Sequence, residues 1–198
     1  MGQPAARLMV VDIAFAVSGG RLPRDHSLAL WQALERAVPS LAEDEATAVL
    51  PIRAASAGEL GLVLARRSRL LMRLPEARVA AALELCGKRL ELGGALIEVG
   101  AAKTRPLVPH ATLYSQRVAA EFDGEPAFVG QVARALACLG IHSEFIVGKR
   151  SGTRGIEGEL TGYSVMLAEL APSASLTLQA AGLGAHRRLG FGVFVGHK

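Results

Sequence analysis

A glycine-rich segment near the end of the chain places a histidine and two arginines between closely spaced glycines. It reads GLGAHRRLGFGV over residues 182–193, so its glycines are Gly182, Gly184, Gly190 and Gly192. Glycine tolerates positive φ and a close approach of the backbone, and the amide groups of such a loop can bind an anion. His186, Arg187 and Arg188 would bring positive charge to the same place. The segment therefore predicts a phosphate-binding loop, with a helix cap and a tight turn as the alternative.

Two more histidines are candidates, one at the start of an expected helix and one in an expected loop. His26 follows Asp25, a plausible N-cap, at the start of an expected helix over residues 26–38. His110 precedes an expected strand in the sequence Pro109-His110-Ala111-Thr112. This His-x-Thr is one half of the paired motif of two-histidine phosphoesterases, but no second His-x-Ser/Thr occurs in the chain. Either histidine can also be an ordinary loop or helix-start residue.

The sequence gives no sign of a metal centre or a cofactor. It contains no Asp-x-Asp or His-x-x-x-His pattern, and Glu43-Asp44-Glu45 resembles an exposed loop. Cys86 and Cys138 each fall in an apolar helical pattern, and two cysteines support neither a disulfide framework nor a four-cysteine zinc site. We expect free thiols, a reducing cytoplasm, and no metal or cofactor.

The composition indicates a packed globular protein with a slight preference for anionic partners. Of its 198 residues 51% are hydrophobic, and the net charge is +4, which argues against a disordered chain. The apolar stretch Leu8–Val17 is interrupted by Asp12 and is typical of a strand, not of a signal peptide. No apolar run reaches the length of about 18 residues that spans a bilayer, so we expect no membrane segment.

The expected elements occur in the same order twice. In the first half we predict strands at residues 8–17, 49–54, 60–65 and 69–74, helices at 26–38 and 76–86, and a hairpin over 90–99. In the second half we predict strands at 112–122, 145–147, 163–170 and 191–195, with helices at 125–139 and 173–181. Pro75 and Pro172 each stand between a strand and a helix, which strengthens the parallel.

This order predicts an α+β protein of two tandem ferredoxin-like (βαββαβ) units with antiparallel sheets, over residues 1–104 and 105–198. The first unit would carry His26 and the second the glycine-rich loop. Helices would cover one face of each sheet, leaving the other face or the cleft between the units for a ligand. A single elaborated α+β domain is the alternative.

The glycine-rich loop resembles the C-terminal signature of the repeat-associated RNA-binding superfamily of CRISPR systems, which the doubled ferredoxin-like order also fits. Within it, the chain looks like the Cas-six processing endoribonucleases at Leu22-Pro23-Arg24-Asp25-His26, residues 70–75, Pro106-Leu107-Val108-Pro109 and GLGAHRRLGFGVF. The resemblance runs nearly end to end. It implies binding of CRISPR repeat RNA, cleavage of precursor CRISPR RNA into guide RNAs, and often continued association with other subunits of the interference complex.

The resemblance also implies a chemistry and the residues for it. Metal-independent cleavage uses the neighbouring 2′-OH of the RNA as nucleophile, with a general base, a general acid and cations around the phosphorane. The products would be a 2′,3′-cyclic phosphate and a 5′-OH. His26 is the first candidate for the base, because the family commonly keeps its catalytic histidine after the first strand. His110 and His186 are further acid–base candidates.

Further cations in expected turns would follow the RNA backbone beside the glycine loop, and Tyr114 would stack on a base unless it belongs to the core. The cations are Lys103, Arg105, Lys149, Arg150 and Arg154, in addition to Arg187 and Arg188. The main alternative is a non-catalytic RNA-binding scaffold subunit of the same superfamily. His26 favours the nuclease, and a two-histidine phosphodiesterase is the weakest hypothesis.

Overall fold

A five-stranded antiparallel sheet forms from the first half of the chain in the computed structural model, which describes residues 9–53, 56–58 and 61–197. Its strands lie in the order β3 (Ala48–Leu50), β6 (Arg69–Pro75), β1 (Val10–Gly19), β8 (Ala95–Pro106) and β7 (Arg89–Leu92). Alternate residues of β1, among them Ile13 and Phe15, are fully buried, while Ala14 and Ala16 on its other face are half-buried. The sheet is therefore packed on one face and open on the other.

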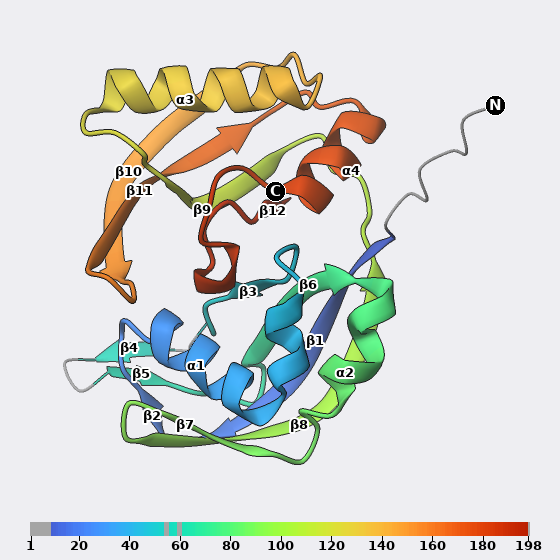
Figure 1. Ribbon diagram of the computed structural model, residues 1–198, viewed down its shortest axis with the longest axis vertical. Helices are drawn as coiled ribbons and strands as arrows, with labels where there is room; N and C mark the ends of the chain where they lie inside the picture. Colours follow the sequence, from blue (N-terminus) through green and yellow to red (C-terminus); the bar gives the residue numbers. More distant parts are fainter. Residues whose placement is uncertain (1–8, 54–55, 59–60, 198) are drawn as a thin grey trace.

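The packed face is covered by α1 (Ser27–Ala37) and α2 (Val79–Leu83), with the 3₁₀ turns η1 (Pro39–Glu43) and η2 (Glu76–Arg78) beside them (Figure 1). Leu30, Trp31 and Leu34 of α1 point into this core because they recur at helical spacing on one face. The predicted helix over 76–86 is shorter than expected, since its first turn is 3₁₀ and the chain after Leu83 forms turns.

A four-stranded antiparallel sheet forms from the second half, in the order β10 (Phe145–Arg154), β11 (Glu159–Leu167), β9 (Leu113–Ala119) and β12 (Val195–Gly196). Its helices are α3 (Glu125–Cys138) and α4 (Pro172–Ala181), and Phe128, Val132 and Leu178 join its core. None of the helices in the described part of the chain is long and apolar enough to cross a membrane.

The two sheets have the same topology. In each βαββαβ unit the second, third, first and fourth strands lie side by side: β3, β6, β1 and β8 in one, and β10, β11, β9 and β12 in the other. All pairs are antiparallel. The prediction of two tandem ferredoxin-like units is therefore confirmed. The boundary at residues 104/105 remains a prediction, and β8 continues past it to Pro106, where the chain leaves the first sheet.

Two strand predictions differ from the structure in more than their exact bounds. Instead of one strand over 60–65, β5 (Gly61–Val63) joins β2 (Arg21–Leu22) and β4 (Ser56–Gly58) in a separate small sheet. Leu60 and Ala54, at the ends of two predicted strands, lie outside the described residues. The last strand is only Val195–Gly196, because Phe191 and Phe194 pack into the cores of the first and the second unit and the register with β9 begins at Val195.

Arg73 of β6 joins the two units. Its guanidinium is 1% exposed and pairs with Asp12 of β1, with Nε 2.7 Å from Oδ1 and Nη2 3.0 Å from Oδ2. Its Nη1 donates to two carbonyl oxygens of the second unit, Gln179 at 3.0 Å and Phe194 at 2.6 Å. One buried arginine thus fixes the end of α4 and the last segment of the chain on the open face of the first sheet.

Candidate functional site

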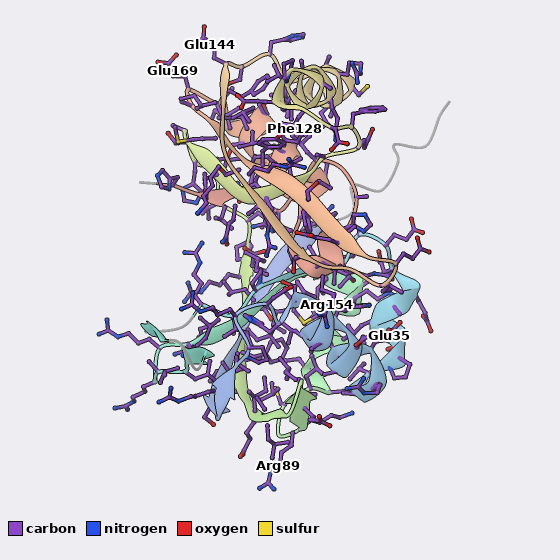
Figure 2. All side chains as sticks on the ribbon, turned by 90° about the vertical axis from the view of Figure 1, so that its left-hand side faces the viewer. Glu35, Arg89, Phe128, Glu144, Arg154 and Glu169 are labelled. Carbon is purple, nitrogen blue, oxygen red and sulfur yellow. The ribbon has the colours of Figure 1, made fainter. Side chains whose placement is uncertain are left out.

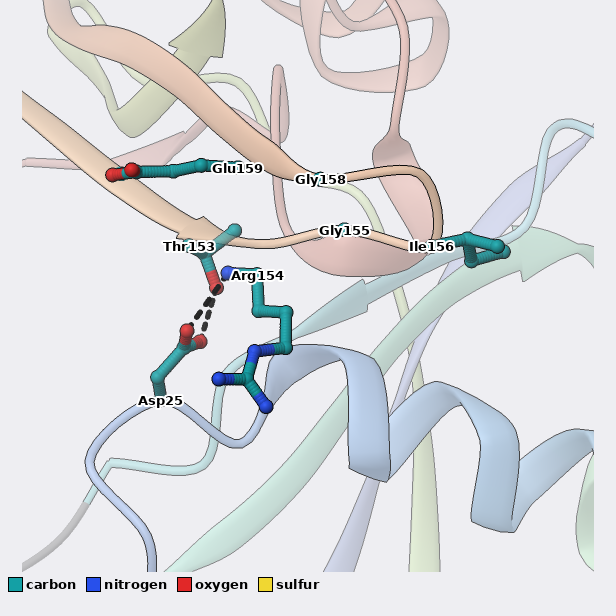
Figure 3. Close-up of a pocket in the computed structure, with 8 residues that line it drawn as sticks. Asp25, Thr153, Arg154, Gly155, Ile156, Gly158 and Glu159 are labelled. Atoms are coloured by element: carbon teal, nitrogen blue, oxygen red, sulfur yellow. Dashed lines mark hydrogen bonds between the residues drawn. The ribbon is translucent and has the colours of Figure 1, made fainter.

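Three segments meet at a cleft between the units: the start of α1, the tip of the β10–β11 hairpin and the glycine-rich loop, residues 182–192. One hollow is lined by Asp25 and residues 152–156, 158 and 159, which Figure 3 shows in close-up. The adjoining hollow is lined by Trp31, Glu45 and residues 184–189. Ile156 at the hairpin tip lines both and is 80% exposed. We call these two hollows together the inter-unit cleft.

The sequence predicts that Asp25 caps α1, and this prediction is wrong. Asp25 instead binds the hairpin of the other unit. The N-cap is His26, without a side-chain hydrogen bond. The Asp25 carboxylate accepts hydrogen bonds from the Thr153 hydroxyl and, at 2.8 Å, from the Arg154 amide (Figure 3). An N-cap bond satisfies an amide of its own helix, so the tertiary contact has replaced a local one here.

The glycine-rich loop owes three of its glycines, Gly182, Gly190 and Gly192, to tight packing inside the protein. A Cβ on Gly192 would lie 1.9 Å from the Leu183 carbonyl oxygen, and one on Gly190 would lie 2.6 Å from Cδ of Pro51. Both glycines also have positive φ. Gly182 ends α4, and a Cβ there would lie 2.6 Å from the Gly192 carbonyl oxygen, whereas Gly184 is exposed and a Cβ there would make only ordinary contacts. These glycines thus allow the backbone to pack closely against other atoms of the protein. Their predicted contact with RNA remains a prediction.

Arg187 and Arg188 both bind protein groups. Arg187 donates to the Ala180 carbonyl at 3.0 Å and to the Ala181 carbonyl, at the end of α4, while its Nε and Nη2 are buried and have no hydrogen-bond partner among the described residues. Burial, aided by the charge of Arg73, lowers the pKa of Arg187 to about 10. Arg188 donates to the Ala42 carbonyl at 2.7 Å. Each therefore holds the loop in place.

His186 is the predicted acid–base histidine that lines the cleft. It is exposed, it has a left-handed backbone (φ 62°), and its ring meets the edge of Phe191, with centroids 6.1 Å apart. In the described part of the chain, no backbone acceptor is bonded to the amide groups of Gly184, Ala185 and His186. An exposed imidazole beside free amide donors is suited to bind an anionic group and exchange a proton with it.

His26 is 2% exposed, and both of its ring nitrogens are engaged. Nε2 accepts a hydrogen bond from the Ile52 amide at 3.0 Å, so the proton is on Nδ1, which lies 3.0 Å from the Pro23 carbonyl. Burial lowers the pKa of His26 below the ordinary value of an imidazole. A general base must be neutral and have a free lone pair. The His26 ring is neutral, but its lone pair on Nε2 already accepts the hydrogen bond from Ile52. This geometry favours a structural role, and the predicted general-base role remains a prediction.

His110 and Tyr114 lie away from the cleft, around β12. The exposed ring of His110 lies against Gly196, and its backbone amide donates to the Ser175 hydroxyl at 2.9 Å. Tyr114 is half-buried and its ring lies 5.5 Å from that of His197, so it does not belong to the core. The structure therefore brings only His186 of the three histidines into contact with the cleft. No group of three or more metal-binding side chains occurs among the described residues.

The predicted cations divide into two sets. Lys149, Arg150 and Arg154 are exposed on β10, where Lys149 lies in a bulge and Arg150 pairs with the exposed Asp123 at 3.6 Å. Figure 2 labels Arg154, near the junction of the two units. Lys103 and Arg105 instead extend from β8 on the open face of the first sheet. There they line a groove with three arginines that sequence reasoning missed: Arg53, Arg67 and Arg69.

Other important residues were also missed. Arg117 of β9 is 9% exposed, donates to the Gly152 carbonyl at 3.2 Å, and has its guanidinium 5.1 Å from the ring centroid of Phe191. Burial lowers its pKa. A single arginine in a strand carries no local signal of such a contact. For Arg53, Arg67 and Arg69, the density of arginine between residues 53 and 69 was a signal that could have been used.

Comparison with known proteins gives a consistent result. The profile of the Cas6 family, described as "Cas6 Crispr", matches residues 11–198. The "CRISPR-associated endonuclease Cas6" of Myxococcus xanthus (strain DK1622) is 33% identical over 189 residues, which cover 95% of this chain and 82% of that protein.

Solved structures share the fold at low sequence identity. The structure titled "Characterization of a Cas6-related gene from Pyrococcus furiosus" has a TM-score of 0.69 at 13% identity and covers 94% of this chain and 98% of its own. "CRISPR associated protein Cas6" has a TM-score of 0.67 at 11% identity, covering 96% and 99%. With a family profile that spans nearly the whole chain, a relative of one-third identity and the doubled ferredoxin-like fold, this protein belongs to the Cas6 family.

Proposed function

We propose that this protein is an endoribonuclease that binds CRISPR repeat RNA and cuts precursor CRISPR RNA into guide RNAs. Its membership of the Cas6 family supports the proposal, since the Myxococcus relative is named an endonuclease. A structure with the same fold, "CRISPR endoribonuclease Cse3 bound to 19 nt RNA", has a TM-score of 0.53 at 13% identity and covers 94% of this chain and 98% of its own.

The exposed His186 in the inter-unit cleft carries the chemical part of the proposal. A scissile phosphate beside His186 would meet the free amide groups of residues 184–186, which can stabilise the charge that develops on the phosphorane. The imidazole would move a proton to or from the 2′-OH or the leaving 5′-oxygen. Cleavage is then a metal-independent attack of the 2′-OH that yields a 2′,3′-cyclic phosphate and a 5′-OH.

In this proposal His26 has a structural role, because it links residues Pro23 and Ile52 of the first unit. Arg154 and Lys149 on the hairpin would bind phosphates of the RNA backbone. The Asp25 contact holds the hairpin over the cleft, so the substrate passes between elements of both units. After cleavage the protein would remain bound to the guide RNA as a subunit of the interference complex.

One observation favours a second function, that of a non-catalytic RNA-binding scaffold. Both ring nitrogens of His26, the first histidine candidate, are hydrogen-bonded within the protein. The two functions separate when the protein is incubated in EDTA with repeat RNA from the CRISPR array of its own genome. The nuclease proposal expects cleavage at one position. RNA that stays intact while tightly bound identifies the scaffold.

A further inference from the structure

A β-bulge in β9 sets the direction of the Arg117 side chain. Where β9 pairs with β11, Gln116 and Arg117 together lie opposite the single residue Ser164. Such a bulge re-aims side chains and is frequent beside active sites. Leu113 and Val118 both join the core beneath α3, although they are an odd number of positions apart and would lie on opposite faces of a regular strand. The bulge therefore turns Arg117 away from that core and toward the first unit.

The Arg117 guanidinium holds the aromatic ring that His186 contacts. It lies over the Phe191 ring, 5.1 Å from the ring centroid, and the His186 ring meets the edge of the same ring with its centroid 6.1 Å away. Phe191 is fully buried, and a Cβ on Gly162 of β11 would lie 3.1 Å from its Cε1. A cation attracted to the face of a buried ring opposes the tilting of that ring. The orientation of the exposed imidazole therefore depends, through Phe191, on a buried arginine.

The backbone of Arg117 binds the same loop. Its carbonyl oxygen accepts a hydrogen bond from the Gly192 amide at 2.7 Å and another from the Ser115 hydroxyl at 2.9 Å. The bulge makes these bonds possible, because Arg117 has no partner residue in the β9–β11 register. Since Gly192 directly follows Phe191, the ring and the backbone beside it are both attached to one residue of β9.

The same guanidinium binds the other wall of the inter-unit cleft. Its Nη1 donates to the Gly152 carbonyl of β10 at 3.2 Å, and Gly152 lines the cleft together with the hairpin residues that follow it. The next residue, Thr153, donates its hydroxyl to Asp25. Arg117 thus connects the loop that carries His186 with the hairpin, so a substrate between them would meet two walls at a fixed spacing.

The burial of Arg117 argues against a direct contact with the substrate. Its side chain is 9% exposed, and it is not among the described residues that line either hollow of the inter-unit cleft. To reach a phosphate it would have to leave the Gly152 carbonyl and the Phe191 ring. Its effect on a reaction in the cleft would therefore come through the groups that it holds.

We propose that Arg117 is a positioning residue for the cleavage: it holds Phe191, and through this ring His186, where the imidazole exchanges a proton with the substrate. The inference rests on the proposed function for the role of His186. Placement of this kind matters because a misplacement of about 1 Å can slow a reaction by about 10²-fold. The proposal assigns Arg117 no contact with RNA, unlike the cations of the hairpin.

The test compares Arg117→Met and Arg117→Lys with the wild type. The matched control is Gln131→Met, because Gln131 is also buried in the second unit and donates to the Ala119 carbonyl at the end of β9 at 2.8 Å. Single-turnover cleavage at saturating protein gives the rate, and fluorescence anisotropy with repeat RNA gives the affinity. Urea unfolding gives the stability of each variant, and all rates are measured well below the unfolding transitions.

Arg117→Met is expected to cut about 10- to 100-fold more slowly than the wild type, with unchanged affinity for the RNA. Arg117→Lys keeps a cation for the face of Phe191 and should recover part of the rate. The control should lose stability and keep the rate. An Arg117→Met rate equal to that of the control would overturn the proposal, as would a loss of affinity as large as the loss of rate. A lysine variant as slow as the methionine variant would overturn the cation–ring contact as the means of positioning.

A second comparison asks whether Arg117 acts through His186. In the double variant His186→Ala with Arg117→Met, the second change should slow cleavage no further, because residues that act as a unit have non-additive effects. Losses that multiply would show an independent action of Arg117 and would overturn the proposal.

The NMR signals of the His186 imidazole give a readout that does not depend on activity. They should shift in Arg117→Met, because the neighbouring Phe191 ring moves, and should stay in place in Gln131→Met. If the wild type does not cut RNA, the proposed function fails, while these signals still decide about the positioning. Unshifted His186 signals in Arg117→Met would overturn it.

Discussion

The guanidinium of Arg188 lies over the indole ring of Trp31, 4.9 Å from the ring centroid. This contact joins the glycine-rich loop of the second unit to α1 of the first, and the 2.7 Å hydrogen bond from Arg188 to the Ala42 carbonyl reinforces it. The basic residues of the loop therefore have a structural role within the protein itself. They fix the position of His186, which directly precedes Arg187 and Arg188 in the chain.

We expect the Arg188–Trp31 pair to show a measurable coupling free energy. A cation over an aromatic face contributes about 0.5–2 kcal/mol, with the larger values for desolvated pairs. A double-mutant cycle with Arg188→Met and Trp31→Leu, followed by urea unfolding, should give a coupling in this range. Arg36→Met is the control, because Arg36 is exposed in the last turn of α1. Strictly additive losses would mean that the contact does not hold the loop.

Replacing Arg73 with methionine should destabilise the protein more than replacing Arg78, a half-buried arginine that pairs with the exposed Glu43. The change leaves Asp12, whose side chain is 36% exposed, and the buried carbonyls of Gln179 and Phe194 without their donor, and a hydrogen bond to a charged group typically contributes about 1.5–3 kcal/mol. Arg78→Met removes the more accessible pairs with Glu43 and Asp44, for each of which about 0–1 kcal/mol is expected. Chemical denaturation measures both. Similar losses for the two variants would contradict the role of Arg73 as the link between the units.

The variant His186→Ala should lose cleavage and keep binding. Removal of a general acid or base typically slows a reaction by about 10²–10⁴-fold, and the loop should keep its fold because the His186 side chain is exposed. Single-turnover cleavage and RNA affinity are measured side by side. His142→Ala, an exposed histidine after α3, is the control and should cut at the wild-type rate. Full activity of His186→Ala would remove this residue from the chemistry.

The main effect of His26→Ala should be a lower free energy of unfolding. The substitution leaves the Ile52 amide without its acceptor, and an unsatisfied buried donor costs about 1–3 kcal/mol. Urea unfolding measures the loss, and cleavage is assayed well below the unfolding transition. A variant that remains fully folded and binds RNA, but has lost cleavage, would return the general-base role to His26.

The pH dependence of stability gives an independent test of His26. Burial lowers its pKa in the folded protein, so between that value and about 6.5, the ordinary pKa of histidine, the unfolded chain binds a proton that the folded protein does not. The contribution of His26 is therefore fully present above this window and is lost as the pH falls. Unfolding free energies at about pH 7.5 and about pH 5.5 should converge between the wild type and His26→Gln on acidification. A constant difference would contradict the burial of a neutral imidazole.

The repeated order of elements made the fold predictable. The helix predicted over residues 125–139 is observed as α3, Glu125–Cys138, so its end was predicted to within one residue. Pro75 and Pro172 stand at the expected junctions between a strand and a helix. Local sequence patterns predicted the structure less well where contacts between distant residues decide the conformation. Phe191 and Phe194 have the pattern of a strand, but Phe191 packs into the core of the first unit and Phe194 into the core of the second. Asp25 has the sequence of an N-cap, but its carboxylate bonds to a hairpin that lies 128 residues away along the chain.

The site was less predictable than the fold, for the same physical reason. Sequence reasoning located the glycine-rich loop and His186, but not the direction in which its arginines turn. Arg187 turns back to the end of α4, and Arg188 turns to α1. The groove on the open face of the first sheet depends on strand pairing: Lys103 and Arg69 come together only because β8 and β6 flank β1. No local pattern contains that pairing.

Metal-independent cleavage by the 2′-OH is tested most directly with repeat RNA in EDTA, with and without a 2′-deoxy nucleotide on the 5′ side of the cut. The proposed mechanism requires the 2′-OH at that position as the nucleophile. We predict one cut in the all-ribose RNA, with a 2′,3′-cyclic phosphate on the upstream product, and no cut in the deoxy-substituted RNA, which should still bind. Cleavage of the deoxy RNA at the same position, or no cleavage of either RNA, would contradict the account.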